Sequence, residues 1–146
     1  MLASGSASVR CPHCDADFSL VLEEIASGPA IVARYRELGG HAGDARDVVR
    51  SAGEGVSAAR QTLDQAATAL GSRIALLVDV LDPEAVIVGG GLGTTPGAYW
   101  DALVTAVRDH IWWRDARHLP ILQAALGPDS GAVGAALTAR DMAETN

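Results

Sequence analysis

Apolar side chains recur every three to four positions through most of the chain, which is the spacing of amphipathic helices. This periodicity predicts helices over 18–38, 45–52, 55–81, 96–111 and 130–142. The first of these is expected to break at Gly28-Pro29, because proline cannot donate the backbone hydrogen bond that an uninterrupted helix needs. Asp44 is expected to cap the helix that begins at Ala45.

Two short apolar runs predict strands. Ala85–Val88 is a continuous β-branched run of the kind found in parallel strands buried on both faces, and Pro120–Leu126 predicts a second strand. The stretch Ile74–Leu81 is apolar nearly all round and is expected at the centre of the fold. The order of elements indicates an α/β class that is rich in helices and has few strands. Because two strands cannot shield both faces of a sheet, the chain is expected to be one lobe whose remaining strands lie elsewhere.

Length and charge narrow the possible functions. The 146 residues fit one domain, with residues 1–10 expected as a linker and 11–146 as the lobe. A formal net charge of −7 argues against direct nucleic-acid binding. All 11 cationic side chains are Arg, which excludes chemistry that needs a lysine amine. Three acidic residues interrupt the most apolar window, 74–92, so no membrane span is expected there. Residues 1–8 do not read as a signal peptide, and we expect a cytoplasmic protein.

The strongest local motif is a run of glycines directly after the strand over 85–88. Gly89, Gly90 and Gly91 can approach a ligand closely, and ligands of open α/β sheets bind at this end of a strand. A tight strand-to-helix turn without a ligand explains the run equally well. Gly131 and Gly134 are expected to allow close packing of the last helix on a strand.

Three segments in this order resemble the carboxyl-terminal half of the ROK family of repressors, open reading frames and sugar kinases. They are EEIASGPAI (23–31), LDPEAVIVGGG (81–91) and ALGPDSGAVGAA (125–136). The resemblance implies the carboxyl-terminal lobe of an actin-like ATPase (ribonuclease-H-like) fold. It also implies a cytoplasmic protein, often dimeric, that binds a sugar and ATP with Mg²⁺.

The resemblance also assigns site residues. Gly89, Gly90 and Gly91 match the glycines that lie beside the adenosine and ribose of ATP. Glu23 matches the glutamate that accepts hydrogen bonds from sugar hydroxyls, although Glu24 is equally eligible from the residues alone. The family's phosphate loop and catalytic aspartate belong to its amino-terminal half and have no counterpart here. We therefore expect no catalytic residue in this chain, no sugar phosphorylation by it alone, and a partner that is either a missing amino-terminal lobe or a second copy.

The two cysteines lie in the tetrapeptide Cys11-Pro12-His13-Cys14, where the family carries a zinc loop. This chain keeps at most three of the four ligands that zinc needs, and they are close neighbours, so we expect no native zinc site. The tetrapeptide also resembles the active site of DsbA-type proteins, which makes a thiol oxidoreductase an alternative from another class. Within the family, the alternative is the sugar-sensing lobe of a repressor.

Overall fold

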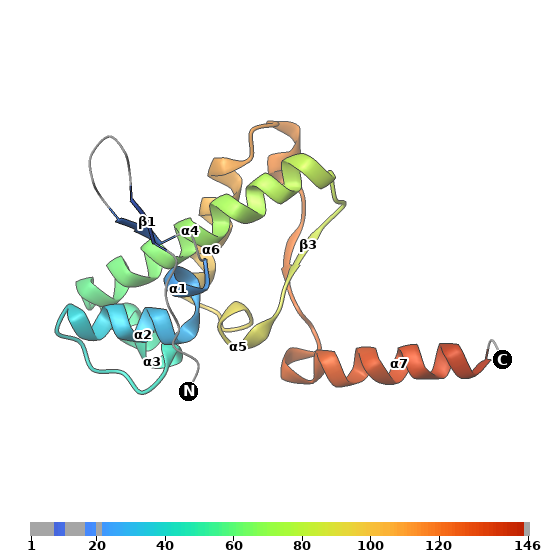
Figure 1. Ribbon diagram of the computed structural model, residues 1–146, viewed down its shortest axis with the longest axis horizontal. Coiled ribbons are helices and arrows are strands. Elements are labelled where there is room, and N and C mark those ends of the chain that lie inside the picture. The colour runs from blue at the N-terminus through green and yellow to red at the C-terminus, as the bar shows by residue number, and fades with distance from the viewer. Residues whose placement is uncertain (1–7, 11–16, 20–21, 145–146) are drawn as a thin grey trace.

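Figure 1 shows the computed structural model of the chain, which describes residues 8–10, 17–19 and 22–144. Helices and short strands follow one another along the chain. In order they are β1 (Ser8–Arg10), β2 (Asp17–Ser19), α1 (Glu23–Ala26), α2 (Gly28–Glu37), α3 (Ala45–Gly53), α4 (Ser57–Leu81), β3 (Val86–Val88), α5 (Gly90–Gly93), α6 (Ala98–His110), the 3-10 turn η1 (Asp115–His118), β4 (Ile121–Gln123), the 3-10 turn η2 (Gly127–Asp129) and α7 (Ser130–Glu144).

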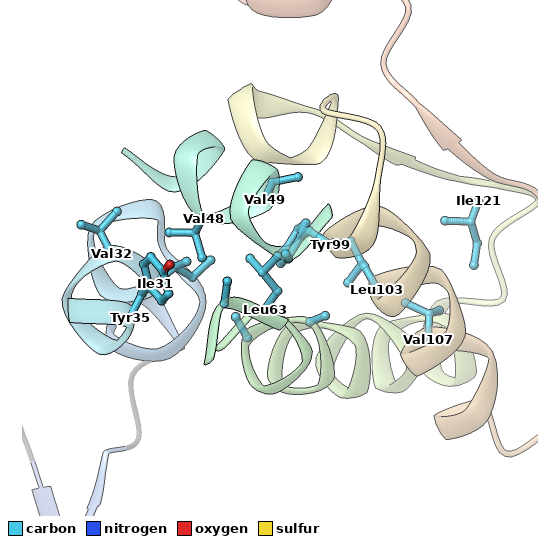
Figure 2. Close-up of a cluster of buried hydrophobic side chains, with 14 of the residues drawn as sticks. Ile31, Val32, Tyr35, Val48, Val49, Leu63, Tyr99, Leu103, Val107 and Ile121 are labelled. Carbon is cyan, nitrogen blue, oxygen red and sulfur yellow. The ribbon is translucent and has the colours of Figure 1, made fainter. Parts of the chain in front are cut away.

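The core is a helical body in which α4 packs along α6, with α2 and α3 against its amino-terminal half. Figure 2 shows the buried side chains that these helices and β4 contribute. Where α4 crosses α6 the side chains are small: a Cβ on Gly71 would lie 2.7 Å from the Cβ of Ala106 and 3.0 Å from the backbone nitrogen of Val107. The two helix backbones therefore approach more closely at Gly71 than any larger residue would allow.

The described residues also form two sheets of two strands each. β1 and β2 pair antiparallel, with Val9 opposite Phe18. The last three residues of the expected linker therefore form a strand, and Phe18, expected in the first helix, lies in a strand as well, because the helix begins only at Glu23. β3 and β4 pair in parallel, with Val86 opposite Ile121 and Val88 opposite Gln123. Ile121 is buried and Val86 and Val88 pack against the core, so one face of the β3–β4 sheet covers the helices.

The other face of the β3–β4 sheet is exposed, which corrects the expectation of a strand buried on both sides. Ile87 is 69% exposed, and its partner across the sheet, Leu122, is also exposed. The end of α4 departs from expectation in the same way, because four of its large apolar side chains are exposed: Leu76, Leu77, Val80 and Leu81. The sequence shows that these residues are apolar, but within the described part of the chain no element covers them.

Helix α7 extends away from the helical body (Figure 1). Its principal neighbour is the turn η2, and every side chain from Gly131 to Ala143 is exposed. Among the residues that the structure describes, none lies within 4 Å of a Cβ built on Gly131 or Gly134, so these glycines do not pack on a described strand, contrary to expectation. The apolar residues Val133, Leu137 and Met142 are exposed as well.

Replacing Gly71 by Ala tests the close approach of α4 and α6. The added methyl has no room against Ala106 and the α6 backbone, and overpacking of this kind costs about 1–3 kcal/mol. Gly53→Ala is the matched control, because a Cβ on that helical glycine meets nothing within 4 Å. Urea unfolding should show a lower free energy of unfolding for Gly71→Ala and an equal or higher one for Gly53→Ala. Equal effects of the two substitutions would contradict this packing.

Candidate functional site

A cavity of about 890 Å³ opens between the starts of α1, α2 and α3 and the turn that follows β3. Its wall includes Glu23 and the three consecutive glycines Gly89, Gly90 and Gly91. These residues are far apart in sequence, and the long helix α4 lies between them in the chain. The fold thus brings all four sequence-predicted site residues to one cavity, which is called the cleft cavity below.

Glu23 is the first residue of α1, and its side chain is exposed. It lines the cleft cavity, whereas the neighbouring Glu24 is not part of the lining. The structure thus separates two carboxylates that the sequence left equivalent. An exposed carboxylate on a cavity wall can accept hydrogen bonds from the hydroxyls of a bound polyol.

The chain beyond Glu23 is fixed by a helix cap. The Oγ of Ser27 accepts a hydrogen bond of 3.2 Å from the backbone N–H of Ala30, and Pro29 occupies the first turn of α2. A Cβ on Gly28 would lie 3.7 Å from the Cβ of Ala45, so the starts of α2 and α3 are in contact. The Ser27-Gly28-Pro29 segment therefore sets the cavity wall between Glu23 and α3.

The start of α3 is held by reciprocal capping. The Asp44 carboxylate accepts from the backbone N–H groups of Arg46 and Asp47, at 2.8 and 3.0 Å. The Asp47 carboxylate accepts in turn from Gly43 and Asp44, at 2.8 and 3.3 Å. These two backbone hydrogen bonds, from Gly43 and then from Asp44, are the main reasons that the pKa of Asp47 lies below its ordinary value. Asp47 also pairs with Arg50.

The glycines of the turn after β3, called the glycine turn (Gly89–Gly91), differ in backbone conformation and in what they contact. Gly90 has a φ of +82°, a conformation that side chains disfavour. Gly90–Gly93 then form the short helix α5, which precedes the helix predicted from residue 96. A Cβ on Gly93 would lie 2.7 Å from Cγ1 of Val88, so this position packs directly on β3. Gly89 and Gly91 are exposed and leave bare backbone on the cavity wall.

Sequence reasoning missed the other polar residues of the cleft cavity. Arg36, Asp44 and Arg46 line it, and so does the buried Tyr99, whose pKa is raised by burial. The cap at Asp44 predicted where α3 begins and so placed Arg46 in its first turn. No pattern in the sequence indicated that this turn faces the glycines after β3.

The cysteine tetrapeptide lies outside the described residues, so the expectations for Cys11, His13 and Cys14 stay predictions. Within the described ranges, no group of three or more His, Cys, Asp or Glu side chains is arranged to hold a metal ion. None of the helices in the described part of the chain is both long and apolar enough to span a membrane.

Comparisons with known proteins agree with one another. Residues 7–142 match the ROK family. The bifunctional enzyme NanE/NanK of Brucella melitensis is 39% identical over 115 residues, which cover 79% of this chain and 21% of that enzyme. The ROK hexokinase from Thermus thermophilus has a TM-score of 0.71 at 33% identity, covering 87% of this chain and 43% of the hexokinase. The ROK family glucokinase from Streptomyces griseus, solved in complex with glucose and AMPPNP, has a TM-score of 0.72 at 26% identity, covering 90% and 48% of the two chains.

A ROK family transcriptional regulator, a homologue of the E. coli MLC protein, shares the fold with a TM-score of 0.59 at 20% identity. The chain spans less than half the length of the hexokinase and the glucokinase, and about a fifth of the bifunctional enzyme.

Asp47 makes the stability of the α3 start depend on pH. Because its pKa is lowered in the folded state, Asp47 stabilises the fold at neutral pH. This contribution is lost as the pH falls below the ordinary value of 3.8 and through the folded pKa. Asp47→Asn should therefore be less stable than the wild type at pH 7, and the difference should shrink by pH 3. Urea unfolding at pH 7, 5 and 3 measures it, with Asp64→Asn on the exposed face of α4 as the control for the lost charge. A difference that stays constant over this range would count against the cap.

Proposed function

The chain belongs to the ROK family, and on this premise we propose that it is the carboxyl-terminal lobe of a sugar kinase. In this proposal it supplies the sugar side and the adenosine side of a cleft, and an amino-terminal lobe supplies the phosphate loop and the catalytic aspartate. The observation that carries the proposal is that Glu23 and the glycine turn line the same cavity.

In this proposal Glu23 binds the sugar. Its carboxylate stands exposed on the cavity wall, where it can accept hydrogen bonds from two neighbouring hydroxyls of a hexose. A wall that leaves this carboxylate unpaired when a sugar lacks those hydroxyls selects against that sugar. The Thermus hexokinase and the Streptomyces glucokinase, the latter solved with glucose bound, support a hexose as the substrate class.

In this proposal the glycine turn contacts the adenosine of the nucleotide. Because Gly89 and Gly91 carry no side chain of their own and are exposed on the cavity wall, a flat purine or a ribose can approach the backbone of the turn closely. The AMPPNP complex of the Streptomyces relative supports an adenine nucleotide as the second ligand. In this proposal the ligand is ATP with Mg²⁺, and this chain holds the purine end.

The exposed apolar surface supports an amino-terminal lobe as the partner. The outer face of the β3–β4 sheet, the end of α4 and the apolar side chains of α7 are all exposed. In this proposal these exposed apolar surfaces are covered by another polypeptide, and burying each large side chain contributes about 1.5–3 kcal/mol. The relatives that share the fold are about twice as long as this chain. A second lobe therefore suits this surface better than a second copy does.

Two alternatives have less support. The repressor lobe rests on a regulator that shares the fold at 20% identity, against 33% for the hexokinase and 39% for the bifunctional enzyme. The translated DNA upstream of Met1 distinguishes kinase from repressor, because a repressor has a winged-helix segment there and a kinase a phosphate loop. The thiol oxidoreductase has no support among these relatives.

Glu23→Gln should weaken glucose binding to the 146-residue chain by about 10- to 100-fold, since a hydrogen bond to a charged acceptor contributes about 1.5–3 kcal/mol. Glu24→Gln is the matched control, because Glu24 does not line the cavity. Ligand-observed NMR titration with glucose measures the affinity of both variants. An equal loss in the two variants, or no loss in Glu23→Gln, would remove Glu23 from the sugar site.

A further inference from the structure

Two arginines line the cleft cavity, and they differ in what their side chains do. The Arg36 guanidinium donates a hydrogen bond of 2.6 Å to the carbonyl oxygen of Ala42 and so closes the loop before α3. The Arg46 guanidinium has no hydrogen-bond acceptor and no carboxylate partner within the described part of the chain, although its backbone N–H is bound by Asp44. Arg46 thus presents an uncommitted cation to the cavity.

The position of this cation is set by the glycine turn. A Cβ built on Gly91 would lie 3.3 Å from Nη2 of Arg46, so the guanidinium lies against the bare face of Gly91. The capping box at Asp44 and Asp47 fixes the helical turn that carries Arg46. The cation and the glycine turn are therefore adjacent parts of one wall, brought together from α3 and from the end of β3.

The chemistry of this arrangement favours an anion. The guanidinium is a positively charged, planar set of donors that matches the oxygens of a phosphate. The chain as a whole has a formal net charge of −7, which repels anions. The exposed, unpaired Arg46 guanidinium on the cavity wall is a positive charge that attracts an anion locally.

We propose that Arg46 donates hydrogen bonds to the phosphate nearest the ribose of a purine nucleotide held against the glycine turn. This inference rests on the proposed adenosine side of the cleft cavity and assigns that side a specificity residue for nucleotides over nucleosides. Arg46 acts in binding and takes no part in moving the phosphoryl group.

The test compares ATP with adenosine as probes on the 146-residue chain, by calorimetry or ligand-observed NMR. Arg46→Ala should lower the affinity for ATP at least tenfold and leave the affinity for adenosine unchanged. Arg46→Lys should recover part of the ATP affinity, because it restores the charge without the planar donors. Arg73→Ala removes the same charge from the exposed face of α4, outside the cleft cavity, and should leave both affinities unchanged.

Three other outcomes overturn the inference, and they differ in what they say of the proposed function. If Arg46→Ala lowers the ATP and adenosine affinities equally, the guanidinium stacks on the purine and the phosphate contact is wrong. If Arg46→Ala and Arg73→Ala change the affinity for ATP equally, or neither changes it, Arg46 makes no specific contact with the phosphate. In both cases the adenosine side of the cavity still stands. If the wild type binds neither ATP nor adenosine, the nucleotide side of the proposed function fails together with Arg46.

Discussion

The close packing of α4 against α6 is the contact on which the rest of the cavity depends. Gly71 lets the two helix backbones meet, and between these helices the chain runs out along β3 and back through the glycine turn. Because α2 and α3 pack on the other end of α4, the same helix holds Glu23 and the glycine turn at a common opening. In a chain with few aromatic residues, the small side chains at this crossing let the two helices pack closely.

Much of the helical fold could be predicted from local signals. The break at Gly28-Pro29 and the cap at Asp44 lie where the sequence placed them, because both act through the backbone of their own turn. The environment of the apolar runs could not be predicted. Large apolar side chains at the end of α4, Ile87 in β3, and Val133, Leu137 and Met142 in α7 are exposed. The sequence shows that these positions are apolar, but it does not show which part of a protein would cover them.

In the cleft cavity too, local motifs could be read from the sequence, whereas contacts between distant segments could not. Short motifs predicted Glu23 and the glycines as site residues, and the structure adds that they share a cavity and that Glu24 is outside its lining. Arg46 could not be identified, because its place depends on the packing of α3 against the turn after β3, a contact between segments with no common motif. The sequence predicted a strand buried on both faces, whereas the outer face of β3 is exposed at Ile87, and a second lobe that covers this face stays a proposal.

The central claim is that this chain is one wall of a two-lobed cleft, complete in its helical body and uncovered along the β3–β4 sheet and α7. Hydrogen–deuterium exchange on the monomeric 146-residue chain tests it most directly, because protection follows how well each element is packed. The claim predicts strong protection of the amides in α4 and α6 and rapid exchange throughout α7. Protection of α7 equal to that of α4 in the monomer would show that the chain closes its own fold, and would contradict the account.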